Sequence, residues 1–148
     1  MVNDGPFPAP PGSEPVIEVA AGLVFRHGRL LITQRPAGGH LAGLWEFPGG
    51  KREPAETFEA CLLRELQEEL GIEVAVREEI EAVRHVYPQK TVFLRFFLCE
   101  WLRCEPQALG CQNFAWIQRD ELSRFDFPPA DVRLLAKLRD TPAWWNVA

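Results

Sequence analysis

Three glutamates close together in the sequence have the chemistry and the spacing of a cation-binding site. Glu65, Glu68 and Glu69 stand at positions i, i+3 and i+4 of a helix expected over residues 56–70, so their carboxylates are neighbours. Like charges at this spacing repel, and a bound cation would relieve the repulsion. Hard oxygen ligands suit Mg²⁺ or Mn²⁺. Taken alone, however, such a cluster is also typical of a solvated acidic helix face.

The negative charge of the chain is concentrated around these glutamates. The 148 residues include 16 basic and 21 acidic side chains, which give a formal charge of −5. Residues 51–81 alone hold ten glutamates and four basic residues, a charge of −6, so the rest of the chain carries +1. This acidity argues against a protein that coats duplex DNA by neutralising phosphates. It does not argue against a nucleotide, because divalent cations can cover the acidic segment.

The expected helix over residues 56–70 has clear start and stop signals. Thr57 is a candidate N-cap, and Gly71 is a candidate for the residue that follows the helix. The apolar stripe expected on the side opposite the glutamates consists of Leu63, Leu66 and Leu70.

The remaining elements predict a mixed α/β fold. Strands are expected over residues 16–25, 29–35, 72–76, 80–87, 91–101 and 114–117, and a second helix over 131–139. His27 and Gly28 are expected to form a hairpin turn, and residues 36–54 a loop rich in glycine and proline. Because strands and helices do not alternate regularly, a mixed sheet is favoured over a doubly wound parallel one.

The ends and the cysteines give the expected organisation and location. Residues 1–15 contain five prolines and are expected to form a disordered arm before a single domain over 16–148. No apolar run approaches membrane-spanning length, and no signal peptide is visible at the start. The four cysteines form no CxxC pair, which favours reduced thiols over a zinc site or a disulfide framework. We therefore expect a cytoplasmic protein.

A longer motif surrounds the glutamates. Gly50 is followed after five residues by Glu56, and after seven more by the run RELQEELGI at residues 64–72. This pattern resembles the Nudix box in full, and the resemblance extends over about residues 16–138. Within the superfamily the chain most resembles the MutT type, through LWEFPGGK at 44–51 and FPPA at 127–130. The resemblance implies an α/β/α sandwich around a mixed β-sheet.

The resemblance also implies an activity, namely Mg²⁺-dependent hydrolysis of a nucleoside diphosphate linked to another moiety. MutT-like members convert a nucleoside triphosphate to the monophosphate and pyrophosphate, with water attacking the β-phosphorus. The implied metal ligands are the Glu65, Glu68 and Glu69 carboxylates and the carbonyl oxygen of Gly49. Either Glu68 or Glu65 is expected to be the catalytic base, and the sequence does not choose between them. Arg64 is expected to hold these glutamates in place through a salt bridge.

Further positions are implied beside the phosphates. Glu56 is expected to support the geometry between loop and helix, and Arg35 resembles the phosphate-side arginine of the family. An exposed charge at the end of a strand is the alternative for Arg35. MutT-like proteins often carry another glutamate in the loop before the last strand, and that position here is Gly110. Glu100 and Glu105 are close in sequence, but neither can be assigned to the missing role.

Four aromatic or basic residues are candidates for nucleotide binding. Phe47 is expected to stack on the base, whereas Trp45 fits the core and the pocket equally well. Tyr87 and Lys90 stand at a turn where MutT relatives have substrate-contacting side chains. An ordinary hairpin tip is the alternative for these two residues.

Asp131 is the most informative candidate for recognition of the base. MutT relatives that recognise 8-oxoguanine have asparagine after FPPA, and asparagine can donate to O6 while it accepts from N7–H. An ionised aspartate only accepts, which suits an amino group such as cytosine N4. A protonated Asp131 would restore the donor. The alternative is an N-cap for the final helix.

These residues predict a pyrophosphohydrolase that removes oxidised purine nucleotides such as 8-oxo-dGTP and so protects DNA. Hydrolysis of CTP or modified dCTP is the alternative. A non-catalytic module that recognises 8-oxoguanine, like the C-terminal domain of adenine DNA glycosylases, is disfavoured by the intact box and the net charge. The expected partner is a small-molecule nucleotide, without duplex nucleic acid or membrane, and the protein is expected to be a monomer or homodimer. Trp144 and Trp145 are expected to close the core or to form a dimer contact.

Overall fold

A seven-stranded mixed sheet forms the centre of the protein in the computed structural model, which describes residues 15–39 and 41–146. The strands are β1 (Val16–Arg26), β2 (Arg29–Gln34), β3 (Trp45–Glu46), β4 (Gly49–Lys51), β5 (Glu73–Tyr87), β6 (Lys90–Arg103) and β7 (Asn113–Ile117). The main order is β3-β2-β1-β6-β5, with β4 paired to β1 and β7 paired to β2. Strands β1 and β6 run parallel, and the other pairs of the described chain are antiparallel.

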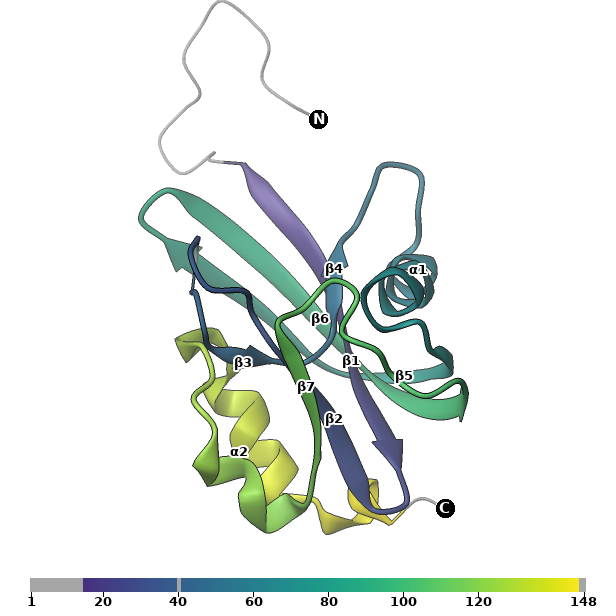
Figure 1. Ribbon diagram of the computed structural model, residues 1–148. Helices are drawn as coiled ribbons and strands as arrows, with labels where there is room; N and C mark the ends of the chain where they lie inside the picture. Colours follow the sequence, from purple (N-terminus) through teal and green to yellow (C-terminus); the bar gives the residue numbers. More distant parts are fainter. Residues whose placement is uncertain (1–14, 40, 147–148) are drawn as a thin grey trace, which may run out of the picture.

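Two helices cover opposite faces of this sheet (Figure 1). Helix α1 (Phe58–Leu70) packs on the face formed by Ala20, Val24 and Leu31, and α2 (Val132–Asp140) packs on the opposite face. Alternate residues of a strand point to opposite sides, so one strand can serve both cores. The expected α/β/α sandwich around a mixed sheet is therefore confirmed. The expected proline-rich arm lies outside the described residues, apart from Pro15.

Helix α1 is bounded by the caps that the sequence predicts. The Thr57 hydroxyl accepts a hydrogen bond from the Ala60 amide at 3.0 Å, and Gly71 adopts the left-handed conformation with φ 69°. The helix thus begins at Phe58, and Glu56 lies before it rather than in its first turn.

The predicted apolar stripe of α1 was wrong at one position. Leu63 is 46% exposed, whereas its neighbour Leu62 is fully buried with Leu66 and Leu70. The reason is geometric, because residues 62, 66 and 70 repeat at four-residue intervals and Leu63 is rotated about 100° from Leu62. The sheet therefore contacts Leu62, Leu66 and Leu70, and Leu63 points toward solvent.

Two segments differ from the expected strand pattern. The expected loop over residues 36–54 contains the short strands β3 and β4, which pair with β2 and β1. Strand β5 continues through the charged residues 77–79, where a break was expected between two strands. The register between β5 and β6 shifts on both sides of Glu79, which accommodates the charged segment. The ion pair of Glu79 with Arg95 stabilises the segment in the sheet. The His27–Gly28 turn is confirmed, with φ of 51° and 75°.

The C-terminal segment closes the core on the α2 side. Leu134 and Leu138 are fully buried, and the Trp145 indole donates to the Leu138 carbonyl at 3.0 Å. The Trp145 ring also packs edge-on against Phe25, with 5.2 Å between centroids. Of the two expected roles, Trp145 therefore takes the one in the core.

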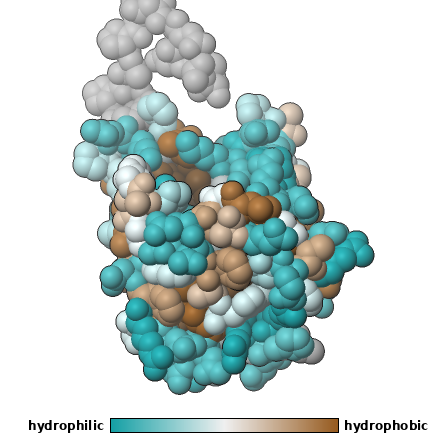
Figure 2. Space-filling view, viewed as in Figure 1, coloured by the Kyte–Doolittle hydropathy of each residue, from teal (hydrophilic) through white to brown (hydrophobic). Residues whose placement is uncertain are grey.

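Hydrophilic residues form much of the rim of the face shown in Figure 2. Figure 2 shows hydrophobic side chains in a recess between hydrophilic rims toward the upper end of one face. Within residues 15–39 and 41–146, no helix is long and apolar enough to cross a membrane.

Candidate active site

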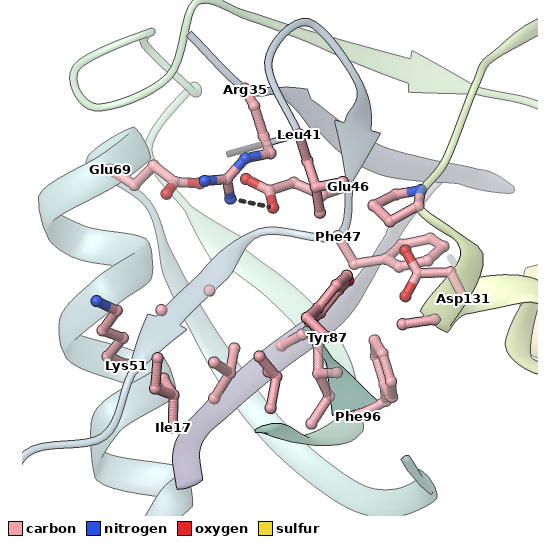
Figure 3. Close-up of a pocket in the computed structure, with 18 of the residues that line it drawn as sticks. Ile17, Arg35, Leu41, Glu46, Phe47, Lys51, Glu69, Tyr87, Phe96 and Asp131 are labelled. Carbon is pink, nitrogen blue, oxygen red and sulfur yellow. Dashed lines mark hydrogen bonds and ion pairs between the residues drawn. The ribbon is translucent and has the colours of Figure 1, made fainter. Parts of the chain in front are cut away.

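A cavity of about 340 Å³ opens between the two helices at one end of the sheet. Strands β1 and β6 supply an apolar floor, and β3, β4, the β5–β6 turn and the start of α2 form the walls (Figure 3). The floor residues are Ile17, Val19, Ala21, Val92, Leu94 and Phe96. Segments far apart in sequence thus meet around one space with a polar end and an aromatic end.

Two glycines allow β4 to lie close against β1 and α1. A Cβ atom on Gly49 would stand 1.9 Å from the Ala20 carbonyl oxygen, so only glycine fits there. A Cβ on Gly50 would stand 2.2 Å from the carboxyl carbon of Glu65. The glycine pair therefore lets the Glu65 carboxylate rest directly on the backbone of β4 at the edge of the cavity.

Arg64 connects the acidic residues around α1. Its Nε and one terminal nitrogen donate to the two carboxylate oxygens of Glu56 at 2.7 and 2.9 Å. Its other terminal nitrogen donates to Oε2 of Glu65 at 2.9 Å and to Oε1 of Glu68 at 3.2 Å. The hydrogen bonds from Arg64 lower the pKa of Glu56 to about 2. One guanidinium thus holds three carboxylates in fixed positions.

Glu69 points away from this network and into the cavity (Figure 3). Its Oε1 atom is buried and has no hydrogen-bond partner among the described residues, and the same holds for the hydroxyl of Thr33. Burial, together with repulsion from Glu46 and Glu65, raises the pKa of Glu69 to about 8, although the charge of Arg35 opposes the rise. A bound divalent cation would be a suitable partner for the Oε1 atom of Glu69.

Arg35 and Glu46 lie on the opposite wall from α1. The Arg35 guanidinium donates to the Glu46 carboxylate at 3.1 Å, and Figure 3 shows both side chains directed toward Glu69. Burial raises the pKa of Glu46, and the charge and hydrogen bond of Arg35 partly offset that effect. The polar end of the cavity thus combines two part-buried carboxylates with one guanidinium.

Aromatic rings form the other end of the cavity. Phe47 is buried, stacks on Phe127 with centroids 5.1 Å apart, and meets Phe96 edge-on at 6.1 Å. Tyr87 and Lys90 line the same end from the β5–β6 turn. A planar aromatic ligand would find stacking partners here.

Asp131 lies at this aromatic end and is only 4% exposed. It stands at the N-cap position of α2, but its side chain makes no capping hydrogen bond. Burial, with a smaller contribution from Glu46, raises the pKa of Asp131 to about 7. Tyr87 lines the same cavity, and burial together with the charge of Asp131 raises its pKa. The N-cap alternative is thus wrong for the Asp131 side chain.

The comparisons with known proteins agree with this arrangement. The Nudix domain signature matches residues 20–137. This chain belongs to the Nudix hydrolase family. A CTP pyrophosphohydrolase of Escherichia coli is 38% identical over 81% of this chain and 89% of its own length. An 8-oxo-dGTP diphosphatase of Haemophilus influenzae is 38% identical over 83% of this chain and 91% of its own length.

A solved structure of a relative extends the match to three dimensions. The solution structure of the E. coli ORF135 protein superposes with a TM-score of 0.75 at 35% identity. The match covers 95% of this chain and all of that chain. The predicted family and fold are therefore confirmed.

The fold brings most of the sequence-predicted site residues together. The cavity is lined by Arg35, Phe47, Gly49, Glu69, Tyr87, Lys90 and Asp131. Arg64, Glu65 and Glu68 lie beside it on α1, joined to one another rather than pointing into it. Within the described residues, no three or more His, Cys, Asp or Glu side chains already form a metal-binding group. The roles assigned to these residues stay predictions.

Three other sequence alternatives are resolved by position. Trp45 packs edge-on against Phe125 and does not line the cavity, so it belongs to the core. Glu100 pairs with Arg77 and Glu105 with Arg26, and neither reaches the cavity.

Gly110, where MutT relatives often have a glutamate, lines the cavity beside Glu69. A Cβ atom there would stand 3.3 Å from the Cα of Glu69, and the Gly110 amide donates to the Glu69 carbonyl at 3.0 Å. The carboxylate facing Glu69 comes instead from Glu46 on β3.

Sequence reasoning gave no role to Glu46, Lys51 or Phe127, although all three stand inside the Nudix motifs. Glu46 and Lys51 line the cavity, and Phe127 stacks on Phe47. The available signal was their place in the LWEFPGGK and FPPA segments, next to residues with assigned roles. The neighbouring glycines and aspartate were easier to identify, because the residue type alone indicates what they can do.

Proposed function

We propose that this protein is a Mg²⁺-dependent nucleoside triphosphate pyrophosphohydrolase that prefers oxidised purine nucleotides such as 8-oxo-dGTP. It would release the nucleoside monophosphate and pyrophosphate. The observation that carries this proposal is one cavity that joins carboxylates and glycines at one end to stacked rings and Asp131 at the other. Its relatives include proteins named 8-oxo-dGTP diphosphatase and CTP pyrophosphohydrolase, which supports a nucleotide substrate.

The polar end fits a divalent cation, with Mg²⁺ as the first candidate and Mn²⁺ as the second. Glu69 offers a buried oxygen without a hydrogen-bond partner in the described chain. Arg64 takes one oxygen of Glu65 and one of Glu68, so the second oxygen of each remains for a metal. The carbonyl oxygen of Gly49 is the further ligand that we propose. The bound metal would neutralise phosphate charge and stabilise negative charge that develops on phosphoryl oxygens.

The side chains of the protein would perform the remaining steps. Arg35 and Lys51 line the cavity and would donate to phosphate oxygens. The carboxylate of Glu65 or Glu68 would accept a proton from the water that attacks the β-phosphorus. Arg64 would keep that carboxylate oriented, because its guanidinium binds both glutamates at once.

The aromatic end favours 8-oxoguanine when Asp131 is protonated. The base would stack against Phe47. A protonated Asp131 can donate to O6 and accept from N7–H, as asparagine does. Because burial raises its pKa to about 7, a large share of Asp131 is protonated at neutral pH. This supports 8-oxo-dGTP as the lead substrate despite the aspartate.

Hydrolysis of CTP or modified dCTP is the second candidate. The ionised form of Asp131 accepts from an amino group such as cytosine N4. A 38% identical relative is named CTP pyrophosphohydrolase, which favours the same alternative.

A nucleotide panel tests the proposal. The rate of pyrophosphate release would be measured with 8-oxo-dGTP, dGTP, CTP and dCTP in the presence of Mg²⁺. The lead proposal expects the highest kcat/KM with 8-oxo-dGTP. Higher kcat/KM with the cytosine nucleotides would replace it by the second candidate, and no metal-dependent release from any of them would reject both.

We further propose that the protein works in the cytoplasm, where it would remove damaged nucleotides before they enter DNA. All four cysteines are free thiols in the structure, which supports a reducing compartment. Incorporation of 8-oxoguanine into DNA would rise when the activity is lost.

A further inference from the structure

An ion-pair cluster around one buried carboxylate lies outside the cavity and has no part in the proposed chemistry. Glu81 on β5 has a side chain that is only 6% exposed. Its Oε1 lies 3.3 Å from Nζ of Lys137, and its Oε2 lies 3.5 Å from a guanidinium nitrogen of Arg133. The Lys137 ammonium also donates to the Ile80 carbonyl at 3.2 Å. A single buried carboxylate thus attaches two cations of α2 to one point on β5.

The attachment of α2 to β5 at Glu81 is expected to be sensitive to loss of either cation. A buried carboxylate without its cations is strongly unfavourable, because its lost hydration is not replaced. Oε2 of Glu81 has no hydrogen-bond partner within the described residues, so it depends on the charge of Arg133. Arg133 and Lys137 are one turn apart on α2, so any slide of the helix along β5 would break both contacts.

The two elements that this cluster joins lead directly to two residues of the aromatic end, Tyr87 and Asp131. On β5, residues 81, 83, 85 and 87 share a face because side chains alternate along a strand. That row ends at Tyr87, whose ring is 4.5 Å from that of His85. On the other side, α2 begins immediately after Asp131. The position of α2 along β5 therefore sets the distance between Asp131 and Tyr87.

We propose that Glu81 is a positioning residue that fixes α2 against β5 and so holds Asp131 at the correct distance from Tyr87. The cluster of Glu81, Arg133 and Lys137 lies outside the cavity but controls the width of its base-binding end. A loosened cluster lets Asp131 move while the metal-binding end, on α1 and β4, stays intact. The consequence for base selectivity rests on the proposed function, whereas the consequence for Tyr87 does not.

The first test follows Tyr87 directly, because it is the only tyrosine in the chain. With ¹³C-labelled tyrosine, the NMR spectrum contains one set of ring signals. We expect these signals to shift in Glu81→Gln and in Lys137→Met. The matched control is Glu79→Gln, which lies on the same strand and is also paired, with Arg95, but on the α1 face of the sheet. Unchanged Tyr87 signals in both cluster variants would overturn the proposal.

The second test measures base selectivity. We expect the kcat/KM ratio of 8-oxo-dGTP to dGTP to fall roughly tenfold in Glu81→Gln and Lys137→Met, through a higher KM for 8-oxo-dGTP, because a small displacement of a binding group costs this much. The ratio should be unchanged in Glu79→Gln. An unchanged ratio in cluster variants with a lowered Tm would mean that Glu81 is structural only. If the wild type hydrolyses neither nucleotide, the proposed function fails, and the Tyr87 signals still decide the role of Glu81.

Discussion

Two neighbouring groups of carboxylates have different surroundings: one group is bound by Arg64, and the other lines the cavity. Glu68 on α1 is 62% exposed and is bound by Arg64, whereas Glu69, the next residue, enters the cavity and has its pKa raised to about 8 by burial. Asp131, from the far end of the chain, lies in the same cavity as Glu69. One residue along a helix rotates the side chain by about 100°, which is enough to move it from solvent to the interior. A run of glutamates is therefore not one chemical unit.

The difference assigns separate tasks to the two groups. Arg64 holds Glu65 and Glu68 through one oxygen each, so the second oxygen of each remains for a cation or a water molecule. The buried carboxylates change protonation near neutral pH, because burial disfavours their charged forms. Under the proposed function, the group around Arg64 suits catalysis, and Asp131 suits discrimination between bases.

The largest expected effect comes from Glu68→Gln, which removes a proposed metal ligand or base from the group around Arg64. We expect kcat for pyrophosphate release to fall roughly 10³-fold, since metal and base each supply several kcal/mol of transition-state stabilisation. Folding should be preserved, because Glu68 is mostly exposed. Glu59→Gln, in the first turn of the same helix, is the matched control and should keep full activity. Full activity in Glu68→Gln would reject the site assignment.

Metal binding should stabilise the fold through Glu69. Mg²⁺ at about 100 times its Kd should raise the Tm of the wild type by about 5–10 °C, because it binds the folded state alone. In Glu69→Gln the shift should be much smaller. Differential scanning fluorimetry with Mg²⁺ and with excess EDTA measures both shifts. Equal shifts in the two proteins would remove Glu69 from the ligand set.

Asp131→Asn should change the pH dependence of selectivity. The folded-state pKa of Asp131 is about 7, so the protonated donor is present below pH 7 and is lost as the pH rises through that value. At pH 8 the kcat/KM of the wild type for 8-oxo-dGTP should be roughly a tenth of its value well below pH 7. The reason is that the protonated fraction of Asp131 falls about tenfold for each pH unit above the pKa.

The asparagine variant should not show this decline, because its amide donor does not titrate. The other titratable and charged groups of the cavity are Arg35, Glu46, Lys51, Glu69, Tyr87 and Lys90. They are the same in both proteins, so the difference between the two pH profiles isolates Asp131. Superimposable profiles would show that Asp131 does not donate to the base.

The smallest effect is expected at an exposed ion pair far from the cavity. Arg77 and Glu100 are 58% and 52% exposed, although their atoms approach to 2.6 Å. Glu100→Gln should change the free energy of unfolding by less than about 0.5 kcal/mol, because solvent screens such pairs. Urea unfolding measures this change. A loss above about 2 kcal/mol would show that short surface pairs matter here as much as buried ones.

Local signals predicted much of the fold correctly. Thr57 and Gly71 mark the two ends of α1, as predicted, because capping depends on hydrogen bonds between residues close in sequence. The His27–Gly28 turn formed for a similar local reason. The continuation of β5 through residues 77–79 could not be predicted, because Arg95 on β6 stabilises Glu79 across the sheet. The pairing of β3 and β4 with β2 and β1 likewise depends on long-range contacts.

By itself the sequence determined the family and the fold class, because the Nudix box is a motif of fixed spacing, and it identified seven of the residues that line the cavity. Only the tertiary structure decided which carboxylates are buried. Glu46 lies near Glu69 because β3 pairs with β2, and Asp131 and Tyr87 line one cavity because the segment just before α2 contacts β5. Burial and charge in a cavity are sums over neighbours that come from distant parts of the chain, so no local pattern encodes them.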